Sequence, residues 1–220
     1  IAQCTTPVSP LPDTAIDEGF GVPALRRVAF DCEQSWVLPA GGSTPGWYAF
    51  AIPEQTALRW PNSGDAQRLD LLPQWLASPP IEGLALSYLQ PRDGELPAFA
   101  VWECADCRST MSQAGIELEG LLSFAGIQAP DHAKPGASVE VVTYWTVIQP
   151  PTRPLSLMLH LRGAGGATVA VGDGLGFPIE YWQPGDVFAQ YHLVDVPVDA
   201  QSGEYFVYTG AYRLDDLRPL

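Results

Sequence analysis

The four cysteines, Cys4, Cys32, Cys104 and Cys107, are the residues with the most chemical options in this sequence. An even number fits a disulfide framework, whereas the Cys-x-x-Cys spacing of Cys104 and Cys107 also occurs in redox pairs and in halves of zinc sites. A redox pair is expected at the start of a helix that follows a strand, but the residues after Cys107 (Arg-Ser-Thr-Met-Ser-Gln) are poor helix formers.

A zinc site needs further Cys or His ligands at suitable spacing. Cys4 and Cys32 are far apart in the chain, and the three histidines, His132, His160 and His192, are dispersed. We therefore expect two structural disulfides, Cys4 with Cys32 and Cys104 with Cys107, and an oxidising, extracytoplasmic compartment. Reduced thiols and zinc or redox chemistry are the alternatives.

Aromatic side chains are the second set of candidates, because the chain contains seven Trp and eight Tyr. Several gather late in the sequence, and an exposed aromatic ring beside polar groups can stack on a sugar or anchor a protein partner. The alternative is that these rings pack between two modules of the chain. The candidates for stacking on a ligand are Tyr181, Trp182, Tyr191 and Tyr212.

Other residues that could do chemistry favour structural explanations. His160 and His192 fall among polar strand neighbours and are expected to face solvent. Residues 172–176 (Gly-Asp-Gly-Leu-Gly) lack the alternating acidic ligands of a calcium loop and predict a glycine-rich bend. Glu117 and Glu119 resemble a glycosidase pair in spacing, but carboxylates on one exposed strand usually only solvate it. No catalytic residue, metal ligand or cofactor site is predicted.

Charge and composition exclude several classes of function. The chain has 25 acidic and 11 basic residues, a formal net charge of −14, so binding to nucleic acid or to an anionic membrane is not expected. Hydrophobic residues make up 46% of the chain, enough for a core, and no apolar run approaches the ~20 residues that span a bilayer. The sequence begins at Ile1 without an initiator Met or a signal segment. We expect it to be a piece of a longer protein that carries a signal peptide or a membrane anchor before this residue.

The first half of the chain predicts mixed secondary structure. An apolar run at 47–52 is typical of a strand buried on both faces, as in an α/β sheet. A helical stripe is predicted over 65–76, although Pro73 weakens it. Further strands are expected at 25–30, 35–38, 83–90 and 98–102, the last two as a hairpin.

The second half predicts an antiparallel β-sandwich. Inward and outward positions alternate throughout 155–162, with leucine at each odd position facing inward. Trp145, in the middle of its strand, is expected to lie in the core of the sandwich. Pro135-Gly136 and Pro184-Gly185 predict type II turns into strands. The expected strands are 115–127, 138–148, 155–162, 167–172, 187–196 and 204–212.

Several of these segments also match a known family. They are Lys134-Pro135-Gly136, Val139 to Trp145, Leu157 to Leu161, Asp173, Tyr181 to Val187, Val196 to Asp199, Gly203 to Tyr205 and Gly210 to Leu214, with Trp36 to Gly41 and Gly46 to Ile52 before them. In these segments the chain resembles the C-terminal extracytoplasmic portion of bacterial multi-pass membrane glycosyltransferases of the dolichyl-phosphate-mannose-protein mannosyltransferase type. The resemblance implies no catalytic residue here, because the catalytic acids of such enzymes lie in loops between membrane helices.

Together these observations predict an α+β protein. A small α/β or α+β module with a Pro-rich leader is expected at 1–110, and an immunoglobulin-like β-sandwich at 111–220. The resemblance implies a non-catalytic accessory domain that binds glycan or protein or shields a membrane-embedded active site. It also implies a periplasmic or cell-surface location, with membrane contact only through a missing anchor. A free-standing secreted or lipid-anchored binding protein is the second hypothesis, and a carbohydrate-active or thiol-redox enzyme the third.

Overall fold

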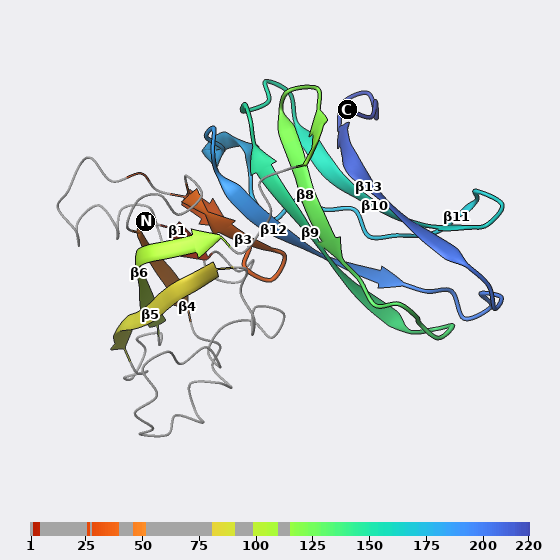
Figure 1. The fold of residues 1–220 in the computed structure, drawn as a ribbon, viewed down its shortest axis with the longest axis horizontal. Coiled ribbons are helices and arrows are strands. Elements are labelled where there is room, and N and C mark those ends of the chain that lie inside the picture. Colours follow the sequence, from red (N-terminus) through yellow and green to blue (C-terminus); the bar gives the residue numbers. More distant parts are fainter. Residues whose placement is uncertain are drawn as a thin grey trace.

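The computed structural model describes residues 2–4, 26, 28–39, 46–51, 81–90, 99–109 and 115–220. These residues form three β-sheets, arranged as a small N-terminal sheet beside a two-layered sandwich (Figure 1). Within the described ranges the helical residues are of the 3-10 type, at Pro39 and in η4 (Ile179–Tyr181), and there is no α-helix.

The N-terminal sheet is mixed and has the strand order β2-β1-β4-β6-β5. Strand β1 runs parallel to β2 and β4, while β4 and β5 each pair antiparallel with β6. The predicted hairpin is therefore confirmed as the β5–β6 pair. The strands are β1 (Ala2–Cys4), β2 (Val28–Phe30), β4 (Gly46–Ala51), β5 (Ile81–Gln90) and β6 (Phe99–Ser109).

Two antiparallel sheets form the sandwich. The five-stranded sandwich sheet has the order β3-β12-β9-β8-β7, and the three-stranded sandwich sheet has the order β11-β10-β13. The strands are β3 (Ser35–Leu38), β7 (Ile116–Leu118), β8 (Leu122–Gln128), β9 (Ser138–Val147), β10 (Leu155–Gly163), β11 (Thr168–Val171), β12 (Val187–Asp195) and β13 (Tyr205–Arg213).

The α+β fold class was wrong, because the structure is almost entirely β. The apolar run before Pro53 does form a strand, β4, but Tyr48 is buried while Trp47 and Ala49 are half-buried, so the expected burial on both faces is incomplete. The mixed α/β or α+β module was expected to contain helix, yet the described parts of residues 1–110 contain no α-helix. The helix predicted over 65–76 lies outside the described residues.

The core follows the predicted alternation in the sandwich. Leu155, Leu157 and Leu159 of β10 are each at most 3% exposed, and Trp145 of β9 is fully buried, which confirms its place in the core. Leu155 and Leu157 share one hydrophobic cluster with Trp145 and Phe188 of the facing sheet, whereas Leu159 belongs to a smaller cluster. Burying a side chain of this size contributes about 1.5 to 3 kcal/mol relative to leaving it exposed, so this end of the sandwich anchors the fold.

One strand of the first region belongs to the sandwich. Strand β3 pairs antiparallel with β12 and forms an edge of the five-stranded sheet. Its Trp36 stacks on Tyr48 of β4, with ring centroids 4.7 Å apart, and the Tyr48 hydroxyl donates to the Val37 carbonyl at 2.9 Å. Buried residues of the N-terminal sheet and of the sandwich therefore belong to the same hydrophobic cluster, and the boundary near residue 110 stays a prediction.

A buried ion pair adds a second link between these regions. The Asp186 carboxylate is fully buried and binds the Arg26 guanidinium, which also donates to the Tyr181 carbonyl at 2.6 Å. Asp186 follows Gly185, whose φ of +88° is the left-handed conformation that the Pro-Gly turn was predicted to need. The turn thus delivers the carboxylate to the position where Arg26 reaches it.

Candidate functional site

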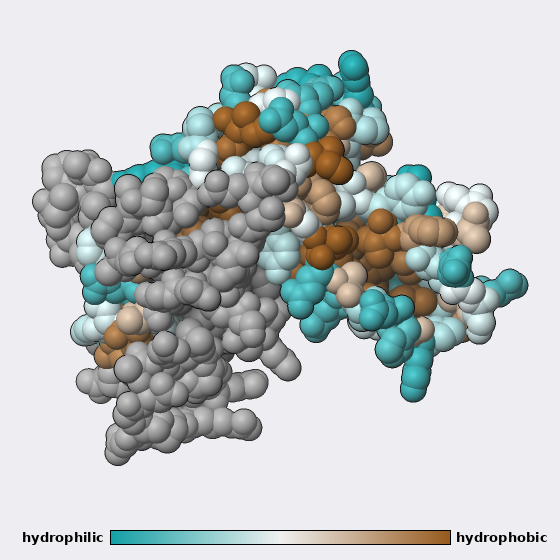
Figure 2. Space-filling model, viewed as in Figure 1, coloured by the Kyte–Doolittle hydropathy of each residue, from teal (hydrophilic) through white to brown (hydrophobic). Residues whose placement is uncertain are grey.

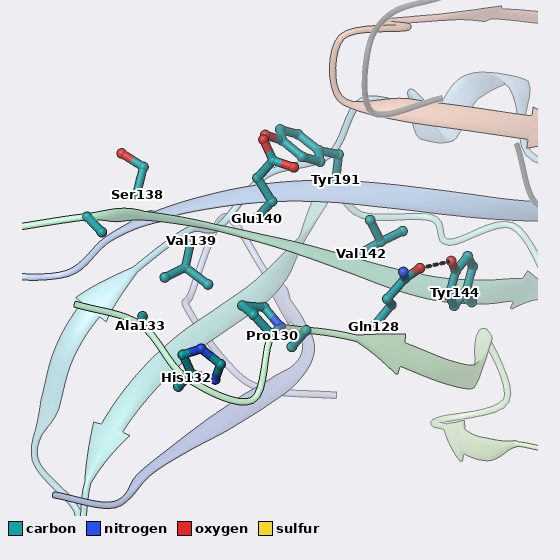
Figure 3. A pocket seen from close by; sticks show the side chains of 12 residues that line it. Gln128, Pro130, His132, Ala133, Ser138, Val139, Glu140, Val142, Tyr144 and Tyr191 are labelled. Atoms are coloured by element: carbon teal, nitrogen blue, oxygen red, sulfur yellow. Dashed lines mark hydrogen bonds between the residues drawn. The ribbon is translucent and has the colours of Figure 1, made fainter. Parts of the chain in front are cut away.

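A groove lies at the end of the five-stranded sandwich sheet where β8 stops before β9 does. Strand β9 pairs with β12 from Ser138 onward, but β8 pairs with β9 only as far as Gln128 opposite Val142. The connection from β8 to β9 runs past the residues of β9 that lack a strand on this side. The polar groove has a volume of about 620 Å³ and is lined by Gln128, Ala129, Pro130, His132, Ala133, Ala137, Ser138, Val139, Glu140, Val142, Tyr144 and Tyr191 (Figure 3).

Strand alternation supplies the polar side chains of this groove. The odd-numbered residues of β9 from Val141 to Val147 are buried in the sandwich. The even-numbered residues Glu140 and Tyr144 consequently face away from the core. Tyr191 lies opposite Val142 on β12, and it therefore shares the outer face.

Glu140 and Tyr191 form one pair within the groove. Figure 3 shows the Glu140 carboxylate beside the Tyr191 ring. Burial, followed by the negative charge of Glu140 and a hydrogen bond to it, raises the pKa of the Tyr191 hydroxyl. The phenol is therefore protonated at neutral pH and stands beside the carboxylate.

Gln128 and Tyr144 form a second pair. The Tyr144 hydroxyl donates to Gln128 Oε1 at 3.1 Å, and burial raises the pKa of this hydroxyl. The Gln128 amide has both acceptor and donor groups, and the phenol has an acceptor oxygen besides its proton. Two aromatic rings, an amide and a carboxylate thus line one groove.

This set of groups suits an uncharged ligand that carries many hydroxyl groups. Carboxylate and amide oxygens accept hydrogen bonds from hydroxyls, and tyrosine rings offer an apolar face beside a polar tip. Glu140 is the sole carboxylate among the described residues that line the groove, whereas glycoside hydrolysis ordinarily uses two. Across the described ranges, no three His, Cys, Asp or Glu side chains cluster closely enough to hold a metal ion.

The four aromatic residues predicted from the sequence are spread over three places. Tyr191 lines the polar groove, and half-buried Tyr181 lies in η4 against the core. Trp182 is 3% exposed and donates its indole N–H to the Phe177 carbonyl at 2.9 Å, so its ring is enclosed by the core and cannot stack on a ligand. Tyr212 belongs to β13 in the other sheet, where it interacts with Ser156 and Asp173.

Glu140, Tyr144 and Gln128 were missed because their signal is weak. Polar side chains occupy the outward positions of most exposed strands, so these residues do not by themselves mark a binding site. Nothing in the sequence shows that β8 ends before β9 does. The register that opens the groove is a tertiary feature. It became visible only from the pairing of β8 with β9.

The predicted exposure of His192 was wrong, since its side chain is 2% exposed. Its polar neighbours in sequence suggested an outer position. The side chains of Gln190 and His192 instead point to the core side of β12, where Gln190 accepts a hydrogen bond from the Gly176 backbone and His192 bonds to Thr143. His160 is closer to the prediction, with a side chain that is 21% exposed and a ring nitrogen 3.4 Å from the Asp173 carboxylate.

Two of the cysteines are both buried and disulfide-bonded, namely Cys32 and Cys104. Strand β6 continues through Cys107 to Ser109, so the pair Cys104 and Cys107 does not stand at the start of a helix. The side chains of Cys4 and Cys107 lie outside the described residues, and the pairings Cys4–Cys32 and Cys104–Cys107 stay predictions.

The sequence was also compared with known families and with curated proteins, and neither comparison finds a match. The likeness to membrane glycosyltransferases and the functions it implies therefore stay predictions. In the ranges that the structure describes, no helix has the length and apolar character needed to cross a membrane.

Proposed function

We propose that this chain is a non-catalytic glycan-binding module and that the polar groove is its binding site. The observation that carries the proposal is the presence of Tyr144, Tyr191, Glu140 and Gln128 in one groove. The two tyrosines offer ring faces for a sugar, and the carboxylate and amide accept its hydroxyl groups.

The geometry of the groove supports recognition without catalysis. The Tyr144 hydroxyl is held by its hydrogen bond to Gln128, and the Tyr191 ring lies beside the Glu140 carboxylate. Side chains that are already oriented lose less conformational freedom when a ligand binds. The overall charge of −14 disfavours anionic ligands, so a neutral glycan is the class that fits.

The proposed role in the cell is that of an accessory domain. The likeness to extracytoplasmic tails of membrane glycosyltransferases supports this role, as do the disulfide-bonded Cys32 and Cys104. In this proposal an immunoglobulin-like sandwich holds a glycan near the membrane-embedded active site of a longer protein. The alternative of a free-standing secreted or lipid-anchored protein uses the same groove.

A glycan array tests the proposal directly. The full chain should bind a defined set of neutral glycans, and Tyr191→Ala should abolish that binding because it removes a ring and the partner of Glu140. Tyr208→Ala is the matched control, since Tyr208 is 45% exposed on the three-stranded sheet, remote from the groove lining. An array without binding, or equal loss in both variants, would contradict the proposal.

The contribution of the carboxylate can be tested separately. Glu140→Gln keeps the size of the side chain but removes its charge. The affinity for the glycan that binds on the array should fall about tenfold, because one charge-assisted hydrogen bond becomes a weaker neutral one. Glu117→Gln changes an exposed acid on β7 of the same sheet and should leave affinity unchanged.

A further inference from the structure

A second cavity opens between the two sheets of the sandwich, and most of its lining residues are apolar, although Asp131, His132, Gln201, Ser202 and Tyr205 also line it. The apolar cleft has a volume of about 330 Å³, and Val141, Leu159 and Val194 at its floor are each at most 2% exposed. Val207 of β13, 39% exposed, stands on the wall formed by the three-stranded sheet. Figure 2 shows hydrophobic side chains gathered in the hollow at the place where Figure 1 shows the gap between β12 and β13.

The sequence explains why this end of the sandwich is open. Around Trp145 and Phe188 the space between the sheets is filled by large aromatic rings. Toward the other end the inward residues Val141, Leu159 and Val194 form a separate small cluster, with buried His192 opposite Val141. Side chains of this size do not fill the gap between the sheets, and a cleft remains.

The apolar cleft and the polar groove share a wall. The residues that line both are Ala129, Pro130, His132, Ala133 and Val139. Figure 3 shows Glu140 and Tyr191 on one side of β9 and Val139 with His132 on the other. The two cavities therefore meet around the edge of β9 that β8 leaves without a strand.

We infer that the polar groove and the apolar cleft together form one site for an uncharged amphiphile, with a sugar head in the groove and an aliphatic tail in the cleft. This inference rests on the proposed glycan-binding function and names the ligand class. A polar ligand alone would leave the aliphatic cleft exposed to water, and a purely apolar ligand would leave the hydrogen-bonding groups of the groove unused.

The charges around the two cavities select the head group. Glu140 lines the groove, Asp131 lines the cleft, and the described lining residues include neither lysine nor arginine. A phosphate or fatty-acid carboxylate would meet these acidic groups without a lysine or arginine beside it. The ligand is therefore a neutral glycoside of an aliphatic alcohol.

The test uses alkyl glucosides of increasing length, from methyl to octyl, titrated below their micelle concentration into the full chain and followed by calorimetry. Each methylene that enters the cleft should strengthen binding about fourfold, until the cleft is full and the affinity levels off. Octyl polyoxyethylene ether, which has the tail without the sugar, should bind more weakly than octyl glucoside.

Two valine substitutions locate the tail. Val207→Glu places a charge in the apolar cleft at a half-exposed position that tolerates it, and it should remove the dependence on chain length while methyl glucoside binds as before. Val171→Glu is the matched control, because Val171 is 53% exposed and lies opposite His160 in the same three-stranded sheet, away from the cleft lining. It should retain the dependence.

The outcomes separate this inference from the function on which it rests. Equal affinity for methyl and octyl glucoside would overturn the amphiphile site and leave glycan binding intact. A chain-length dependence that survives Val207→Glu would also overturn it, because the tail would bind elsewhere. Equal binding of the polyoxyethylene ether and octyl glucoside would show that no sugar is recognised, and both proposals would fail.

Discussion

Protonation of the buried His192 should destabilise the protein at mildly acidic pH. Its Nδ1–H donates to the Gly172 carbonyl at 2.6 Å, and its Nε2 lies 2.9 Å from the Thr143 hydroxyl. That hydroxyl also accepts the Trp145 indole N–H at 2.8 Å, so its own proton points to Nε2, which must be the acceptor. A second ring proton would leave the hydroxyl proton without its acceptor.

Burial lowers the pKa of His192, against smaller opposing effects of the Gly172 carbonyl and the Asp173 carboxylate. The unfolded chain, with a histidine pKa of about 6.5, then binds more protons than the folded chain as the pH falls through this value. Stability is therefore lost with falling pH. If the folded imidazole stays neutral, lowering the pH from 7.5 to 5.5 removes about 1.4 kcal/mol from the free energy of unfolding.

Urea unfolding at the two pH values measures this loss of stability. The carboxylates titrate in both the wild type and His192→Gln, so the difference between the two proteins gives the contribution of His192. The wild type should lose about 1.4 kcal/mol more than the variant between pH 7.5 and 5.5. The same pH dependence in His192→Gln and in the wild type would refute the assigned network.

Three further substitutions test the packing. Thr143→Val leaves Trp145 Nε1 and His192 Nε2 without their partner, and thermal or urea unfolding should show a loss of about 1 to 3 kcal/mol; an unchanged midpoint would contradict the network. Asp186→Asn leaves Arg26 without its carboxylate, and because the arginine is 24% exposed we expect the lower end of the buried-pair range, about 3 kcal/mol. A loss no larger than that of an exposed acid would show that this ion pair does not link the regions. Gly185→Ala meets no atom within 4 Å but must keep a φ of +88°, so it should cost about 1 to 2 kcal/mol in the same assay, and a neutral result would show that the turn relaxes.

Regular alternation made the sandwich predictable. The leucines of β10 and the core position of Trp145 follow from a period of two, and the Pro-Gly turns follow from the φ values that the two residues favour. These are local signals, carried by residues close together in the chain. They place strands and turns but not the partners of each strand.

The features that make the candidate site depend on partners distant in sequence. Strand β3 joins the sandwich through β12, and β8 stops at Gln128 while β9 continues. Neither pairing has a signature in its own residues. His192 shows the same limit, because its burial depends on Thr143 and Gly172, which lie on other segments.

An NMR titration of the full chain, with labelled tyrosine rings and the array-selected glycan, tests the central claim most directly. Substitution of single tyrosines by phenylalanine assigns the ring signals. The account predicts that the signals of Tyr144 and Tyr191 shift together and saturate at one affinity, while those of Tyr208 and Tyr212 stay in place. Shifts confined to Tyr208 and Tyr212 would move the site to the other sheet and contradict the account.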